Sequence, residues 1–169
     1  EAPGQTGIFM TILLKPDIQP ANAPRLTLVA AISVAKAIQK VTGLKAEIKW
    51  PNDIVINGKK VCGILTEMSA QIDYINHIVI GIGINVHNES FSKEVAQIAT
   101  SLDIERKQKT RRADLIAAVW QEFEYYYAIY LETEDLSAIR KEYDSYLVNR
   151  NQRIRVLDPL EPYEGVAQG

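Results

Sequence analysis

Four polar residues in one short stretch have the types and spacing of a chemical site. Asn52 and Asp53 precede a brief apolar run, and Lys59 and Lys60 follow it after an Asn-Gly dipeptide. Fixed ammonium groups can neutralise an anionic substrate, and a nearby carboxylate can bind a metal ion or accept a proton from an amine. The stretch is therefore a candidate site for a reaction that brings negative charges together.

The Asn-Gly dipeptide predicts how these residues are brought together. Asn57 and Gly58 can supply the two positive-φ residues of a type I′ turn, so residues 53–56 and 61–68 are predicted to pair as a hairpin. Residues 77–84 are rich in Val and Ile and are predicted to form a neighbouring strand.

A stiff corner precedes the hairpin. Pro51 fixes its own φ and biases Trp50 towards an extended backbone, which holds Lys49 at the edge of a strand. The corner and the lysine turn are expected to share one rim of the sheet.

Two interpretations of this rim are open. Lysines at a sheet edge can simply discourage aggregation between strands. Alternatively, the rim is a binding site, and Gly63, Gly81 and Gly83 mark places where the backbone approaches a ligand, since glycine inside a strand otherwise weakens it. Three such glycines in two strands favour the second interpretation.

Three sequence blocks carry a family resemblance. The segments KWPND (49–53), GKKVCGILTE (58–67) and IVIGIGINV (78–86) resemble the biotin protein ligase family, in the order and at the spacing of that family. The resemblance covers residues 3–169. The glycine- and arginine-rich biotin loop of the family, and the tryptophan after it, are not found in this sequence, so the catalytic domain is expected to be incomplete at its N-terminus.

The resemblance implies a two-step reaction. ATP would activate biotin as biotinyl-5′-AMP, and biotin would then pass to a lysine of a biotin carboxyl carrier protein. Lys60 matches the catalytic lysine of the family, and Asn52 and Asp53 match its Asn-Asp pair. Asp53 would orient Mg²⁺ or accept a proton from the incoming amine.

The resemblance also implies two sets of binding residues. The biotin site would comprise Lys60, Gly63, Leu65, Gly81, Gly83 and Ile84. The ATP site would comprise Lys49, Asn52 and Asn85.

Composition restricts the remaining possibilities. Nineteen basic and twenty-one acidic residues give a net charge of -2, which offers no general attraction to nucleic acid or anionic membrane. The sequence shows no signal peptide and no apolar run long enough for a membrane span, so a cytoplasmic location is expected. The single cysteine, Cys62, lies in an apolar strand and is predicted to be a buried, unreactive thiol.

The pattern around the candidate site predicts an α+β fold. Apolar residues at helical spacing predict helices over residues 25–42, 113–131 and 136–147, packed on one face of a mixed β-sheet. Residues 92–101 are expected to hold a helical turn or two, and residues 105–112 a polar loop.

The C-terminal residues change in character. Two strand-like runs, residues 153–157 and 163–168, are separated by prolines and would not be stable alone. The family resemblance implies a ligase domain over residues 1–149 and the start of a small SH3-like β-barrel over residues 150–169.

Other functions are either excluded by motif spacing or remain open. A dinucleotide fingerprint is excluded because Val86 stands where its last glycine would be, and His77 and His87 are not spaced as a closed metal site. A lipoate or octanoyl ligase on the same fold, the ligase part of a biotin-responsive repressor, and a non-catalytic binding or dimerisation module all remain as alternatives. A homodimer is possible, and DNA would be bound only through an N-terminal domain that this sequence does not contain.

Overall fold

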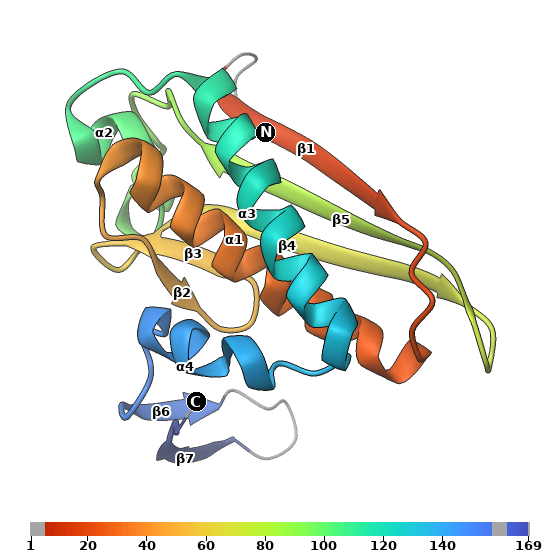
Figure 1. Cartoon of the computed structure of the whole chain (residues 1–169). Coiled ribbons are helices and arrows are strands. Elements are labelled where there is room, and N and C mark those ends of the chain that lie inside the picture. The colour runs from red at the N-terminus through yellow and green to blue at the C-terminus, as the bar shows by residue number, and fades with distance from the viewer. Residues whose placement is uncertain (1–5, 157–161, 169) are drawn as a thin grey trace.

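A five-stranded sheet covered by helices forms the body of the molecule (Figure 1). The computed structural model describes residues 6–156 and 162–168. The elements in chain order are β1 (Gly7–Leu14), η1 (Pro20–Arg25), α1 (Leu26–Thr42), β2 (Glu47–Lys49), β3 (Asp53–Ile56), β4 (Lys59–Ala70), β5 (Ile75–Asn85), η2 (Val95–Gln97), α2 (Leu102–Arg106), α3 (Arg112–Thr133), α4 (Ser137–Tyr146), β6 (Arg153–Val156) and β7 (Tyr163–Val166).

The large sheet has the strand order β1-β5-β4-β3-β2, and all its strand pairs are antiparallel. The α+β class is confirmed, but the prediction of a mixed sheet was wrong. Short turns join β2, β3, β4 and β5 in succession, and neighbours joined in this way must run in opposite directions. The chain from β1 passes through α1 to β2 at the far edge, which leaves β1 to pair with β5.

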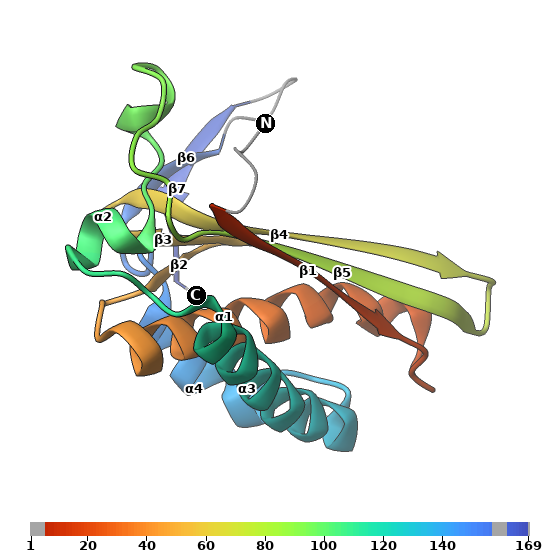
Figure 2. The ribbon, with the colours of Figure 1, turned by 90° about the horizontal axis from the view of Figure 1, so that it is seen from above.

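Helices cover one face of this sheet, as predicted. Figure 2 shows α1 and α3 side by side beneath the strands, and the other face is free of them. The side chains of Ile80, Ile82 and Ile84 on β5 belong to the core, together with the buried face of α1. Gly43 ends α1 in the left-handed conformation (φ 75°), where glycine has no Cβ to clash. The helices therefore leave the opposite face of the sheet available for a site.

Three short elements were not predicted. η1 follows β1, β2 lies just before the Trp50–Pro51 corner, and α2 extends into residues 105–112, which were expected to form a polar loop. Ser101 caps α2, because its hydroxyl oxygen accepts a hydrogen bond from the Ile104 backbone N–H at 3.3 Å. This cap was the available signal for a helix in a stretch dominated by charge.

The C-terminal residues form a separate antiparallel pair, β6 and β7. Leu157, the last residue of the first predicted run, and residues 158–161 of the link that follows it lie outside the described residues. Among the described helices, none combines the length and apolar character that crossing a membrane requires.

Tyr130 provides a test of the core packing. Its side chain is fully buried, and its hydroxyl donates a hydrogen bond to the Asn22 carbonyl at 2.8 Å, which ties α3 to η1. Tyr130→Phe should lower the free energy of unfolding by about 1–3 kcal/mol, because it removes a buried donor from its acceptor. Urea denaturation measures the change, and Tyr125→Phe, at a 59% exposed position, is the matched control. Equal effects of the two substitutions would contradict the assignment.

Candidate active site

The turn that carries the lysines has the predicted geometry. Asn57 (φ 51°) and Gly58 (φ 75°) both have positive φ, as a type I′ turn requires. The strands on either side pair as a hairpin, which brings Asp53 opposite Gly63. At the preceding corner, the Trp50–Pro51 peptide bond is cis.

A β-bulge determines where Lys60 points. Ile54 pairs with Cys62, but the next residue, Val55, pairs with Lys60, so Val61 is an extra residue on β4. In a regular strand, Lys60 would share a face with Cys62, which is buried in the core. A bulge bends the strand and can redirect a side chain. Here the Lys60 side chain lies beside Gly63, on the face away from the helices.

Lys60 forms an ion pair with Asp53. The Lys60 Nζ atom lies 2.6 Å from Asp53 Oδ1, and the two side chains are 47% and 23% exposed. The ammonium group passes so close to Gly63 that a Cβ there would lie 3.1 Å from both Lys60 Cε and Nζ. Gly63 therefore leaves the space in which the lysine and aspartate meet.

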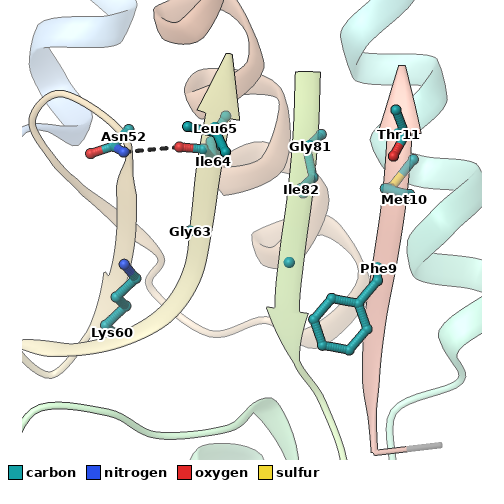
Figure 3. A pocket seen from close by; sticks show the side chains of 11 residues that line it. Phe9, Met10, Thr11, Asn52, Lys60, Gly63, Ile64, Leu65, Gly81 and Ile82 are labelled. Atoms are coloured by element: carbon teal, nitrogen blue, oxygen red, sulfur yellow. Dashed lines mark hydrogen bonds between the residues drawn. The ribbon is translucent and has the colours of Figure 1, made fainter. Parts of the chain in front are cut away.

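The three predicted glycines lie on the floor of one pocket. Gly63 pairs with Gly83, which pairs in turn with Phe9 on β1, while Gly81 lies between Leu65 and Thr11. The result is a shallow strip across β4 and β5 with little side-chain bulk. A pocket of about 460 Å³ lies over it (Figure 3), lined by Phe9, Met10, Thr11, Asn52, Lys60, Gly63, Ile64, Leu65, Gly81, Ile82 and Gly83.

Two large, exposed apolar side chains of the pocket stand at its sides. Phe9 is 74% exposed and Leu65 is 62% exposed. The Phe9 ring leans over β5, and a Cβ at Gly83 would lie 3.6 Å from it (Figure 3). Large exposed apolar groups beside a bare backbone floor are suited to hold a flat, partly apolar ligand.

Asn52 is fixed by β4. Its Nδ2 atom donates to the Ile64 carbonyl at 2.9 Å, and the Ile64 backbone N–H donates to the Asn52 carbonyl at 2.9 Å. The amide side chain thus lines the pocket in a defined orientation. Lys49 is exposed and pairs with Asp53 across β2 and β3, so its side chain extends from the same face just outside the pocket.

Two residues of the predicted site lie elsewhere. Ile84 is 1% exposed and packs in the core, because it alternates with Gly83 along β5 and therefore faces the helices. It does not line the pocket, so we remove it from the candidate biotin site. Asn85 is on the pocket side of the sheet but outside the pocket lining, and its Nδ2 atom donates to the Thr100 carbonyl at 3.1 Å.

Sequence reasoning missed Phe9. Ile8, Met10, Ile12 and Leu14 alternate along this strand as its apolar positions, and Phe9 was not among the candidate residues. Phe9 occupies the opposite phase of that alternation, where a large apolar residue would have to be exposed or functional. That mismatch was the signal that could have found it.

The remaining candidate groups are not part of this pocket. Cys62 is buried, as predicted, and this burial strongly raises the pKa of its thiol. His87 Nδ1 lies 2.6 Å from Asp103 Oδ2 beside a separate cavity of about 520 Å³. Burial acts to raise the pKa of Asp103, but hydrogen bonds from His87 and Thr110 outweigh it and leave the pKa below its usual range.

Comparison with known proteins identifies the family. Residues 1–85 match the model of the Biotin/lipoate A/B protein ligase family. The chain is 43% identical over 156 residues to the bifunctional ligase/repressor BirA of Bacillus spizizenii, an alignment that covers 90% of this chain and 48% of the relative. It is 38% identical over 78 residues to the biotin–[acetyl-CoA-carboxylase] ligase of Paracoccus denitrificans, covering 45% of this chain and 32% of the relative.

A solved structure shows the same fold. The biotin protein ligase of Aquifex aeolicus, in complex with biotin and ATP, superposes with a TM-score of 0.83 at 25% identity, covering 95% of this chain and 66% of that one. The chain spans about half the length of the first curated relatives it matches. The family that the three sequence blocks indicated is confirmed, and the chain belongs to the Biotin/lipoate A/B protein ligase family.

Proposed function

We propose that this chain is the catalytic part of a biotin protein ligase. It would join biotin to ATP as biotinyl-5′-AMP with release of pyrophosphate, and then transfer biotin to a lysine of a biotin carboxyl carrier protein. The observation that carries the proposal is the Lys60 ammonium, held by Asp53 at the end of a glycine-floored pocket. The names of the relatives support it, because they describe biotin ligases and a complex with biotin and ATP.

The pocket suits the ring system of biotin. Gly63, Gly81 and Gly83 present bare backbone, and Phe9 and Leu65 supply apolar walls. A fused bicyclic ring could lie flat on the floor with its valerate chain directed towards Lys60. Apolar walls with few polar groups are typical of small-molecule pockets.

Lys60 would act on both anions of the first step. The biotin carboxylate must approach the α-phosphate of ATP, and negative charge grows on the phosphate as the new P–O bond forms. An ammonium group has three N–H donors, and Asp53 occupies one of them. The others could bridge the carboxylate and the phosphate, which lowers their repulsion and stabilises the transition state.

Asn52, Lys49 and Asn85 would contact the nucleotide. Asn52 lies in the pocket, and Lys49 extends from the same face beside Asp53. Asn85 already binds the Thr100 carbonyl, so its contact with a nucleotide would be made from the edge of the site.

Asp53 fits Mg²⁺ only as a minor ligand. No cluster of three or more His, Cys, Asp or Glu side chains suited to a metal occurs within residues 6–156 and 162–168. Mg²⁺ is commonly held by one or two carboxylates together with substrate phosphates, and Asp53 offers one such carboxylate. When bound, the ion would supply positive charge to the phosphates of ATP.

The proposed function also implies an acceptor protein, a cellular location and a domain arrangement. The acceptor would be the carrier protein of a biotin-dependent carboxylase, and the enzyme would work in the cytoplasm. Residues 1–149 would form the ligase domain, and β6 and β7 would begin a small SH3-like barrel. We also propose that the protein forms a homodimer and that any DNA binding takes place through a domain outside this sequence.

A direct assay tests the proposal. Pyrophosphate release by the full-length protein should require both biotin and ATP, and isothermal titration should show binding of biotin but not of lipoate. A lipoate ligase would show the reverse preference, because its acyl chain needs a longer apolar pocket. A non-catalytic module would release no pyrophosphate with either acid.

Gly63→Ala tests the space beside the catalytic lysine. Its new Cβ would lie 3.1 Å from Lys60 Cε and Nζ, so the end of the lysine side chain would have to shift by a few tenths of an ångström from the position in which it meets Asp53. Because small displacements of a catalytic group are costly, we expect biotin-dependent pyrophosphate release to fall by roughly tenfold or more. Thermal unfolding should show no comparable loss of stability.

Gly81→Ala is the matched comparison. A Cβ at Gly81 would lie 3.7 Å from the Leu65 carbonyl, which is an ordinary contact, and would not touch Lys60. This substitution should raise the KM for biotin more than it lowers kcat. The same kinetic defect in both variants would contradict the role given to the space at Gly63.

A further inference from the structure

The main chain of Lys60 is held by a segment that lies outside the ladder of the sheet. The last paired residues of β4 and β5 on this side are Cys62 and Ile84, so β5 does not reach Lys60. Instead, the Lys60 N–H donates to the Ile98 carbonyl at 2.8 Å, and the Thr100 N–H donates to the Lys60 carbonyl at 2.9 Å. Residues 98–100 thus hold both polar groups of the lysine backbone.

Glu105 fastens this segment to the lysine turn. Thr100 is 2% exposed, and its hydroxyl donates to Glu105 Oε1 at 2.7 Å. The Asn57 Nδ2 atom donates to Glu105 Oε2, also at 2.7 Å. One carboxylate therefore binds the turn that precedes Lys60 and the segment that supports it, with a separate oxygen for each.

Glu105 stands on an element that is itself fixed to the sheet. The Asp103 N–H at the start of α2 donates to the Val86 carbonyl at 3.0 Å. The Ser101 hydroxyl, which caps α2, also donates to the Asn88 carbonyl at 2.7 Å. α2 is thus anchored just beyond β5, which fixes the position of Glu105. Glu105 in turn fixes Asn57 and Thr100, the residues on either side of the Lys60 backbone.

We propose that Glu105 is a positioning residue for Lys60, acting through Asn57 and Thr100. The bulge turns the lysine towards the pocket, and the Glu105 carboxylate holds the two flanking segments in the arrangement that the bulge requires. Hydrogen bonds to an ionised carboxylate are stronger than those between neutral groups, so this residue type suits the role. The kinetic consequence rests on the proposed biotin ligase function, whereas the structural consequence does not.

Glu105→Ala should lower kcat for biotin-dependent pyrophosphate release by roughly tenfold, because the catalytic ammonium group loses its fixed position. The KM for biotin should change by less than about twofold, since Glu105 is not part of the pocket. Glu105→Gln should recover part of the rate. Its amide oxygen can still accept from Thr100, but its amide N–H₂ group faces that of Asn57.

A double variant separates positioning from a general structural effect. If Glu105 acts through Lys60, then Glu105→Ala should add no further loss of rate in a Lys60→Ala background. Glu124→Ala removes an exposed carboxylate of α3 and serves as the control, with wild-type kinetics expected. Full additivity of the Glu105 and Lys60 effects, or a wild-type rate in Glu105→Ala, would overturn the proposal.

Hydrogen exchange tests the contact without the reaction. In Glu105→Ala, the amides of Lys60 and Thr100 should exchange at least several-fold faster, while the Ile64 amide, held by Asn52, should keep its rate. Unchanged protection of the Lys60 and Thr100 amides would overturn the positioning role. Hydrogen exchange tests the positioning role even in a protein that is inactive with biotin. Inactivity of the wild-type protein would overturn the proposed function but not the positioning role.

Discussion

Lys60→Ala should lower the rate of adenylate formation by roughly a hundredfold or more, equivalent to about 3 kcal/mol or more of transition-state stabilisation. The Lys60 side chain is the only ammonium group among the described residues that line the pocket. Without it, the biotin carboxylate and the α-phosphate would meet with their repulsion uncompensated. Biotin-dependent pyrophosphate release under saturating ATP measures the effect, and unchanged release would contradict the assignment.

Lys59→Ala is the matched comparison for this variant. The two lysines are adjacent, but the Lys59 Nζ atom donates to the Ala96 carbonyl at 2.9 Å and does not line the pocket. We expect a loss of less than about fivefold, because the change removes one hydrogen bond from a charged donor to a backbone carbonyl outside the pocket. Both variants should unfold close to the wild-type temperature, because both side chains lie at the surface of the rim. Comparable rate losses would mean that general positive charge, not a placed ammonium group, is what the reaction needs.

The local features of the site could be predicted because short-range chemistry determines them. Asn57 and Gly58 permit the positive φ values that the turn requires, so the hairpin and the neighbouring strand β5 followed from the sequence. The three glycines were informative for the same reason, since strands seldom tolerate them without a purpose. All three lie on the pocket floor.

Ile84 was assigned to the biotin site from the family resemblance alone, and the alternation of side chains along the strand contradicts that assignment. Gly81 and Gly83 share one face of β5, so Ile82 and Ile84 must direct their side chains to the other face. The period of two was visible in the sequence and would have placed Ile84 in the core, where the structure has it.

The sequence indicates the β-bulge in β4 only weakly. Val61 and Cys62 are adjacent apolar residues, and both are buried, which interrupts the alternation expected of a strand with one exposed face. The sequence alone cannot say which of the two is the extra residue. That choice decides whether Lys60 enters the site, and the pairing of β3 with β4 makes it.

Contacts over long sequence separation could not be predicted at all. Glu105 lies 48 residues from Asn57, and the sequence around it was read as a solvated, charge-rich loop. Such a reading is reasonable for most charge runs, because only the folded chain reveals which carboxylate meets a partner. Phe9 is a similar case, since its role depends on the bare backbone of Gly83 on a neighbouring strand.

Asp53→Asn is expected to be the second most damaging substitution. It keeps the shape of the side chain but removes the charge that holds the Lys60 ammonium at 2.6 Å. We expect adenylate formation to slow by roughly tenfold to a hundredfold, while the affinity for biotin changes by less than about threefold. Asp73→Asn, at an exposed position in the turn between β4 and β5, is the control and should behave as wild type.

Measuring the two half-reactions separately identifies which role Asp53 plays. If its main task is to hold Lys60, pyrophosphate release should slow at least as much as transfer from preformed biotinyl-5′-AMP to the carrier protein. If it chiefly accepts a proton from the incoming amine, transfer should be the slower half-reaction and should improve as pH rises, since more of the amine is then already deprotonated. The close ion pair with Lys60 leads us to expect the first pattern. Normal turnover at saturating Mg²⁺, ATP and carrier protein would refute both roles.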